Sequence, residues 1–363
     1  MNVMNSKKRL QLLRKVLFEK ELDAILISSI TTPESSTIPN VYYFTGFYDV
    51  WPTSILLTKA AETLFTFEKD KAETATDIRN IVDLKAKKIS DYLKEMNGHG
   101  MTIGIDGNVD YNYYSALLKK LPKCRLVDIS KEISQIRAIK DDAEITEIKN
   151  ACLLADRVLN DLVSEGLEDK SEKQISERIK QLIVGCGKEW SFPILVAGDE
   201  GSSYIHGTPT TRKFKDLVLI DMGIKSSFYN SDISRTFIFS NDPEMKKAYS
   251  DLVDVHKLLE NEIVPGMSSD DVDALAKSFL EKNGHKHTNY SNFHGLGHGV
   301  GLEVHEYPTL SSKTSFVLKK NMVFTLEPAI YVKGKFGIRL EDTVVLGSKG
   351  IDRLNKYEFD VLS

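Results

Sequence analysis

The stretch FHGLGHGVGLEVHE, residues 293–306, concentrates groups that can do chemistry. It contains three histidines, His294, His298 and His305, whereas the whole chain has only eight. Imidazole is a common metal ligand and titrates near neutral pH, so it also serves as a general acid or base. The four glycines of the stretch add no side-chain packing, which favours a place where backbone and imidazoles come close to a metal or a substrate.

Four acidic residues occur in sequence motifs on either side of this stretch. Asp221 and Asp232 lie in IDMGIKSSFYNSDISRTF, at the end of one expected strand and the start of the next, so a hairpin could let them face each other. Glu327 lies in the apolar stretch FTLEPAIY, and Glu341 lies in GIRLEDTVVL. Carboxylates in such strands are costly to bury unless they are paired or bound to a cation.

These four carboxylates and the imidazole of His298 would carry several net negative charges if they converged, and only cations could hold them together. An oxygen-rich shell with one histidine and no thiolate suits Mn²⁺, with Co²⁺, Zn²⁺ or Fe²⁺ as alternatives. Four carboxylates exceed what one ion needs. We therefore expect two divalent ions about 3.5–4 Å apart, bridged by carboxylates and a hydroxide, which is an arrangement suited to hydrolysis.

Simpler explanations exist for each residue taken alone. A single aspartate at a strand end is usually a solvated cap, and glycine repeats can mark a dinucleotide-binding loop. Here the glycines follow the spacing G-x-G-x-G-x-G and not G-x-G-x-x-G, which argues against that loop. Outside the motifs, His256 is expected at the surface, and His285 and His287 in a solvated turn after a helix.

The elements that must position these residues fall into two parts. Residues 1–130 alternate short apolar strands with helical segments, which predicts an α/β domain. The character then changes to a long amphipathic helix, on which Ile145, Ile148 and Leu159 share one face. The strands expected in the first part cover residues 23–29, 54–58, 63–67, 102–106 and 125–129.

Residues 131–363 show an internal repetition. Ser171 and Gln174 fit a capping box that opens a helix ending near Cys186. Two further helices are expected over residues 242–263 and 269–283, and each helical pair is followed by strands. The expected strands cover residues 193–197, 217–223, 234–240, 322–328 and 337–346. The repeated order indicates a duplication, with helices on one side of a mostly antiparallel sheet.

The bulk composition excludes several classes of protein. The net charge of −4 leaves no basic surplus for neutralising nucleic-acid phosphates. The three cysteines are far apart and form no C-x-x-C, which argues against disulfides and thiolate zinc sites. The N-terminus is too charged for a signal peptide, and no run approaches the ~20 apolar residues of a membrane span. We expect a cytoplasmic protein without nucleic-acid or membrane partners.

In the order Asp…Asp…His…Glu…Glu, the motifs DMG, SDISRTF, GHGVGLEVHE, EPAIY and GIRLEDTV resemble the pita-bread metallopeptidases. They are most similar to the Xaa-Pro branch of that family, the prolidases and aminopeptidase P. The resemblance covers residues 130–363, including HGTPT at 206–210, and extends more weakly to YFTGF at 43–47. It implies an α+β fold, with a small creatinase-like α/β domain (1–130) before an internally duplicated pita-bread catalytic domain (131–363).

The resemblance also implies a function and a role for each site residue. The protein would be a homodimer that hydrolyses the peptide bond before proline in Xaa-Pro dipeptides or Xaa-Pro-Yaa peptides. The metal ligands would be Asp221, Asp232, His298, Glu327 and Glu341. Asp232 and Glu341 would bridge both ions, and Glu327 would also act as general base.

Four further residues would act on the substrate according to the same resemblance. His305 would stabilise the scissile carbonyl or its oxyanion. His206 would hold the proline side, and His294 would lie near the site. Arg339, two residues before Glu341, would orient metal-bound groups and touch the substrate.

The chain departs from the family pattern at two places. Ala329 replaces a glycine that usually follows the Glu-Pro pair, and a positive φ there would strain it. Prolidases often grip the substrate carboxylate with an arginine, whereas residues 307–321 offer only Lys313, Lys319 and Lys320. The choice between dipeptides and longer peptides therefore stays open.

Three alternatives share this scaffold. A creatinase-like amidinohydrolase and a catalytically inactive binding protein would both lose some of the five ligands, and none is lost here. A methionine aminopeptidase would not need residues 1–130. The physiological metal, the residue preferred before proline, and whether a dimer partner completes the site are not determined by the sequence.

Overall fold

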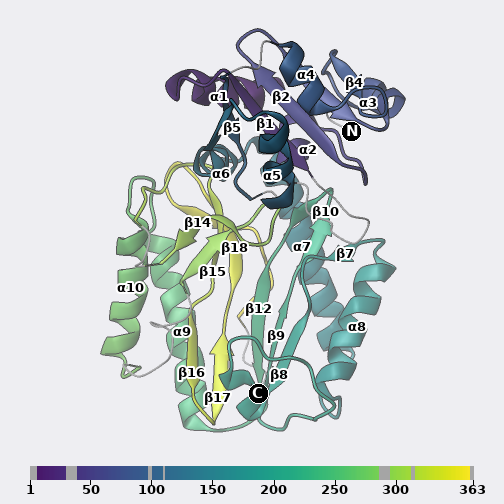
Figure 1. The fold of residues 1–363 in the computed structure, drawn as a ribbon. Helices are drawn as coiled ribbons and strands as arrows, with labels where there is room; N and C mark the ends of the chain where they lie inside the picture. Colours follow the sequence, from purple (N-terminus) through teal and green to yellow (C-terminus); the bar gives the residue numbers. More distant parts are fainter. Residues whose placement is uncertain are drawn as a thin grey trace. The chain divides into compact units, whose positions relative to one another are not determined.

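The computed structural model describes residues 6–29, 39–96, 100–108, 111–285, 295–311 and 315–359. The chain divides into two compact units, Met1–Arg137 and Ala138–Ser363 (Figure 1). The boundary expected at residue 130 falls where helix α6 (Ser130–Ala138) begins, and nearly all of this helix belongs to the first unit.

The first unit contains a six-stranded mixed sheet in the order β4-β3-β2-β1-β5-β6. Its central strand β1 (Ala24–Ser29) runs antiparallel to β2 (Thr53–Thr58) and parallel to β5 (Thr102–Ile105). The other strands are β3 (Glu62–Thr66), β4 (Ile81–Asp83) and β6 (Arg125–Asp128). The helices are α1 (Ser6–Glu19), α2 (Pro39–Thr45), α3 (Lys69–Ala75), α4 (Ile89–Glu95) and α5 (Tyr111–Lys120). Each of the five expected strands is therefore present.

The expected long helix is present as α7 (Asp142–Ser164), which carries Ile145, Ile148 and Leu159, but the chain breaks between it and α6. Asp141 caps α7: its side chain accepts a hydrogen bond from Glu144 N (3.0 Å), and the Glu144 side chain accepts one from Asp141 N (3.0 Å). This reciprocal capping box satisfies two backbone donors at the helix start. It therefore favours starting a new helix at this point over continuing the previous one.

Two helical pairs follow in the second unit. Helix α8 (Glu172–Gly185) opens with the predicted capping box of Ser171 and Gln174. Helices α9 (Pro243–Glu262) and α10 (Ser269–Lys282) form the second pair. Figure 1 shows α7 and α8 on one flank of the strands and α9 and α10 on the other.

The strands between these helices are antiparallel, as expected. One sheet has the order β12-β9-β8, another has the order β14-β13-β15-β18-β19, and β16 pairs with β17. A small sheet has the order β11-β10-β7. The bounds are β7 (Glu189–Trp190), β8 (Leu195–Gly198), β9 (Leu217–Met222), β10 (Ile224–Ser226), β11 (Tyr229–Asn230), β12 (Ile233–Ile238), β13 (Gly297–Gly299), β14 (Glu306–Leu310), β15 (Val323–Leu326), β16 (Ala329–Val332), β17 (Phe336–Arg339), β18 (Asp342–Leu346) and β19 (Ile351–Arg353).

The strand expected over residues 337–346 is divided between β17 and β18, which belong to different sheets. Glu341 lies at the break between them, where its N–H donates to Ser234 O of β12 (3.0 Å). Thr343 Oγ1 also donates to Asp232 O (2.9 Å). These two hydrogen bonds connect the segment around Glu341 with the segment around Asp232, so the acidic residues of the two segments lie close together.

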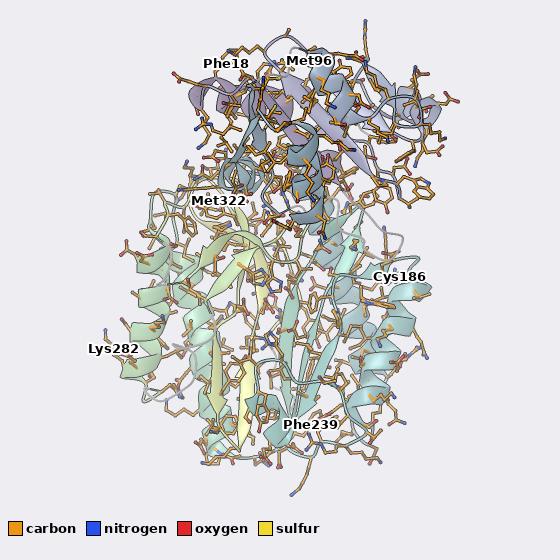
Figure 2. All side chains as sticks on the ribbon, viewed as in Figure 1. Phe18, Met96, Cys186, Phe239, Lys282 and Met322 are labelled. Atoms are coloured by element: carbon orange, nitrogen blue, oxygen red, sulfur yellow. The ribbon has the colours of Figure 1, made fainter. Side chains whose placement is uncertain are left out.

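Each helical pair covers its own apolar core, which the side chains fill (Figure 2). One core includes Leu252, Val272 and Phe324, and the other includes Leu159, Ile179 and Ile220; all of these are at most 1% exposed. In the part of the chain that the structure describes, no helix combines the length and apolar character that a membrane crossing requires.

Candidate metal centre

The first two acidic residues lie at adjoining strand ends. In the register of β9 and β12, Asp221 is opposite Ser234, and Asp232 immediately precedes β12. The chain between them forms the small hairpin of β10 and β11. The expected hairpin is therefore present, with a second hairpin extending from its tip, and both carboxylates point to one cavity.

His298 is the middle residue of β13, and its glycine neighbour explains how the strand packs. A Cβ on Gly297 would lie 1.9 Å from Thr325 O, so only glycine allows β13 to approach Thr325 this closely. The His298 N–H then donates to Thr325 Oγ1 (3.0 Å), which in turn donates to Glu327 Oε1 (3.3 Å). Gly297 therefore allows a close approach to β15, and Thr325 of that strand connects His298 with Glu327.

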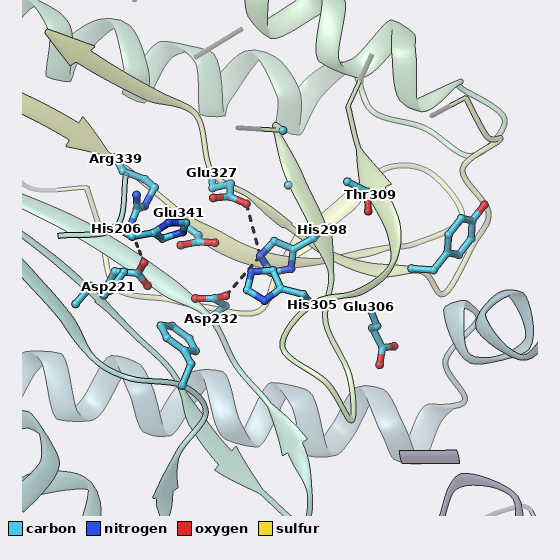
Figure 3. A pocket seen from close by; sticks show the side chains of 15 residues that line it. His206, Asp221, Asp232, His298, His305, Glu306, Thr309, Glu327, Arg339 and Glu341 are labelled. Carbon is cyan, nitrogen blue, oxygen red and sulfur yellow. Dashed lines mark hydrogen bonds and ion pairs between the residues drawn. The ribbon is translucent and has the colours of Figure 1, made fainter. Parts of the chain in front are cut away.

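The five expected ligands all line one cavity of about 520 Å³. His298 Nε2 lies 3.6 Å from Asp232 Oδ2 and 3.6 Å from Glu327 Oε1. Figure 3 marks both pairs with dashed lines. Single ligand atoms of Asp232, His298 and Glu341 all lie within 4.8 Å of one another. Such a cluster can hold a metal ion.

Arg339 connects Asp221 with Glu341 through hydrogen bonds. Its Nη2 donates to Asp221 Oδ2 (2.5 Å), and its Nε donates to Ser234 Oγ (2.9 Å). Ser234 Oγ in turn donates to Glu341 Oε2 (2.6 Å), while Arg339 Nη1 donates to the Tyr331 hydroxyl (2.6 Å). Arg339 lines the same cavity and is only 2% exposed. Because its Nε, Nη1 and Nη2 each donate to one of these partners, it can orient the carboxylates.

Burial and the charge of neighbouring carboxylates raise the pKa values of Asp232, Glu327 and Glu341. Burial is the main cause at Asp232 and Glu341, followed by the charge of Glu341 on Asp232 and of Glu327 on Glu341. Burial also raises the pKa of Glu327 to about 8, although the charge of Arg339 opposes the rise. The single charge of the Arg339 guanidinium therefore does not neutralise the four acidic residues.

The donor set fits a divalent cation. Asp221 Oδ1 and Asp232 Oδ1 are buried and have no hydrogen-bond partner among the described residues. A buried carboxylate oxygen without a donor is costly, and a cation would satisfy both. Oxygen ligands with one imidazole suit hard or borderline ions.

The other expected site residues differ in placement. His305 and His206 both line the cavity and are solvent-exposed, and the His305 ring centroid lies 4.0 Å from that of His298. His294 lies outside the described residues. Ala329 is not among the residues with positive φ, so its expected strain is absent. Lys319 and Lys320 are exposed and do not line the cavity, and Lys313 lies outside the described residues.

Sequence reasoning missed a buried ion pair at the edge of the cavity. Glu306, a cavity residue, lies 2.7 Å from Lys140, which comes from the link before α7. Both side chains are at most 5% exposed. The only sequence feature that could have placed Glu306 at the cavity is its position directly after His305. Nothing in the local sequence marks Lys140 as its partner.

The expectations for two further histidines were wrong. His256 is buried, its Nε2 lies 2.9 Å from Leu340 O, and burial lowers its pKa to about 4. His285 lies 2.6 Å from Asp251, and only 14% of its side chain is exposed. Neither lines the cavity. His287 lies outside the described residues.

Comparison with family models matches both parts of the chain. Residues 146–348 match the model of metallopeptidase family M24. Residues 9–139 match the creatinase/prolidase N-terminal domain.

Individual relatives cover nearly the whole chain. An Xaa-Pro dipeptidase of Pyrococcus horikoshii is 31% identical, over 100% of both sequences. The solved Xaa-Pro dipeptidase of Bacillus anthracis has a TM-score of 0.90 and 25% identity, over 99% of each chain. The X-Pro aminopeptidase of Thermotoga maritima has a TM-score of 0.82 and 27% identity, over 97% of this chain and 99% of its own. The predicted fold class, a creatinase-like domain before a pita-bread domain, is confirmed.

Proposed function

Because the chain belongs to metallopeptidase family M24, we propose that it hydrolyses the peptide bond preceding proline. The observation that carries the proposal is the convergence of four carboxylates and one imidazole on one cavity, with two buried oxygens lacking donors among the described residues. The relatives named Xaa-Pro dipeptidase support the substrate class. An Xaa-Pro bond has no N–H. A peptidase that relies on metal ions does not need a hydrogen bond from that group.

Membership of a metallopeptidase family implies divalent metal ions. We infer two per subunit, Mn²⁺ in the first place, with Co²⁺, Zn²⁺ or Fe²⁺ as alternatives. When bound, such ions acidify water and polarise a carbonyl group. The ligands would be Asp221, Asp232, His298, Glu327 and Glu341, with Asp232 and Glu341 shared between the ions.

The remaining chemistry belongs to side chains of this protein. Glu327, whose carboxylate lines the cavity, would take the proton of the attacking water as general base, the role that the resemblance implies. His305 donates to the scissile carbonyl oxygen as negative charge develops there. His206 lines the same cavity and would hold the proline side of the substrate.

Further parts of the proposal rest on the resemblance. Residues 1–130 form the creatinase-like N-terminal domain and residues 131–363 the catalytic domain. The protein is a homodimer. Its cytoplasmic location is inferred instead from its three widely separated cysteines, which suit a reducing compartment. Its substrate is an Xaa-Pro dipeptide or an Xaa-Pro-Yaa peptide, and the relatives include both a dipeptidase and an aminopeptidase.

Hydrolysis of an Xaa-Pro dipeptide and an Xaa-Pro-Yaa tripeptide, each after chelation and after adding back Mn²⁺, tests this function. We expect chelation to abolish activity and Mn²⁺ to restore it. Restoration on the dipeptide alone makes the protein a prolidase; restoration on the tripeptide makes it an aminopeptidase P type. Inactivity on both substrates with Mn²⁺, Co²⁺, Zn²⁺ and Fe²⁺ would refute the proposal.

His305→Ala separates a catalytic donor from a metal ligand. We expect kcat to fall by roughly 10²–10³-fold with unchanged metal content, the usual effect of removing one oxyanion donor. Kinetics and metal analysis of the same preparations provide the test. His285→Ala, which removes an imidazole outside the cavity, is the control and should keep its kcat. Loss of metal from His305→Ala would instead make His305 a ligand.

A further inference from the structure

We propose that Glu172, a residue outside the cavity, is a positioning residue that fixes the loop carrying His206. The inference rests on the proposed function, because His206 is the group through which Glu172 would act. Glu172 is the first residue of α8 and is 3% exposed. A carboxylate this deeply buried requires partners.

Those partners all come from the chain on either side of His206. Glu172 Oε2 accepts hydrogen bonds from Thr210 N (2.8 Å) and Thr210 Oγ1 (2.6 Å). Glu172 Oε1 accepts one from Gly198 N (2.9 Å). Hydrogen bonds to an ionised acceptor are among the stronger ones, so this carboxylate ties together two points twelve residues apart.

The backbone at the start of α8 holds the same loop. Glu172 N donates to Arg212 O (3.1 Å), and Lys173 N donates to Thr210 O (2.8 Å). These donors belong to the first turn of a helix, which has no acceptors of its own for them. Because Ser171 and Gln174 already form the capping box, the carboxylate of Glu172 is available to hold the loop.

The other end of the loop is held at the metal centre. Arg339 Nη1 donates to Ile205 O (3.2 Å). A Cβ on Gly207 would lie 2.6 Å from Cβ of Ala197, so the loop lies directly against β8. His206 thus lies between an anchor at Ile205 and one at Thr210, and it is the residue of this loop that lines the cavity.

Glu172→Gln tests the proposal. The amide keeps the size of the side chain but replaces one acceptor oxygen with an NH₂ group facing a donor. We expect kcat/KM on an Xaa-Pro substrate to fall by roughly 10–100-fold, mainly through KM, with unchanged metal content. Glu177→Gln, the same change at an exposed position of α8, should behave as wild type. Thr210→Val removes one donor from the loop side and should give a weaker version of the effect.

Two readouts separate positioning from a merely structural role. In hydrogen–deuterium exchange of the metal-free protein, the peptide spanning residues 204–212 should exchange faster in Glu172→Gln, with the rest of α8 unchanged. In a double-mutant cycle, Glu172→Gln should have little further effect on kcat/KM in a His206→Ala background.

Additive losses in that cycle, or unchanged exchange in both Glu172→Gln and Thr210→Val, would overturn the proposal. If Glu172→Gln fails to fold, the Thr210→Val variant carries both tests. Inactivity of the wild-type protein on every Xaa-Pro substrate would refute the proposed function instead, and the exchange measurement would still decide whether Glu172 fixes the loop.

Discussion

Glu341→Gln and Asp232→Asn are each expected to lower kcat/KM by about three orders of magnitude or more, without loss of the fold. Each amide keeps the shape of the side chain and removes the charge proposed to bridge two ions. Metal-ion stabilisation of the developing charge is worth several kcal/mol, and each 1.36 kcal/mol corresponds to about tenfold in rate. Kinetics with saturating Mn²⁺ and the number of ions bound per subunit provide the measurement.

The control is Glu281→Gln, which makes the same change at an exposed position of α10. It should retain wild-type activity and metal content. If Glu341→Gln or Asp232→Asn stays as active as this control, the two-metal assignment is wrong.

The same substitutions should stabilise the metal-free protein. The pKa of Glu341 is raised above its ordinary value of 4.5 by burial and by neighbouring carboxylates. A carboxyl group with a raised pKa in the folded state destabilises the fold as the pH rises above the unfolded value. The gain in Tm for metal-free Glu341→Gln should therefore be small near pH 4 and larger near pH 8. The stabilisation that Mn²⁺ gives to wild type should be reduced in the variant.

That these five residues come together could be predicted from the sequence, because metal chemistry demands particular residue types. Few combinations other than carboxylates with an imidazole can hold two hard cations. The order of these residue types can be read directly from the sequence. Periodicity likewise predicted the strands and helical pairs, because burying one face of each element imposes it. The order of motifs was thus enough for the fold class, but not for the roles of individual residues.

What the sequence could not supply depends on contacts between distant segments. At Glu341 the chain passes from β17 to β18, which belong to different sheets. The local sequence pattern, in contrast, is that of one continuous strand. Lys140 and Glu306 are separated by 166 residues, so neither marks the other. Only the break before α7 had a local signal, the capping box of Asp141 and Glu144.

Arg339 is a buried positive charge paired with Asp221 in this cluster, and its removal should affect folding and metal binding together. In Arg339→Met, Asp221 loses its ion pair in a site that stays buried. Breaking such a pair typically costs about 3–5 kcal/mol. Chemical denaturation of the metal-free protein should show a loss of this size, and saturating Mn²⁺ should recover part of it.

Arg339→Lys is the sharper variant, because it keeps the charge and changes only the geometry. A lysine ammonium is a point charge and cannot reproduce the planar donors that reach Asp221, Ser234 and Tyr331 together. We expect the Mn²⁺ affinity to fall by roughly 10–100-fold, as for other residues that orient metal ligands. Arg157→Lys, at an exposed position of α7, should bind Mn²⁺ as wild type does. If Arg339→Lys also binds like wild type, then charge alone matters and the guanidinium does not orient the ligands.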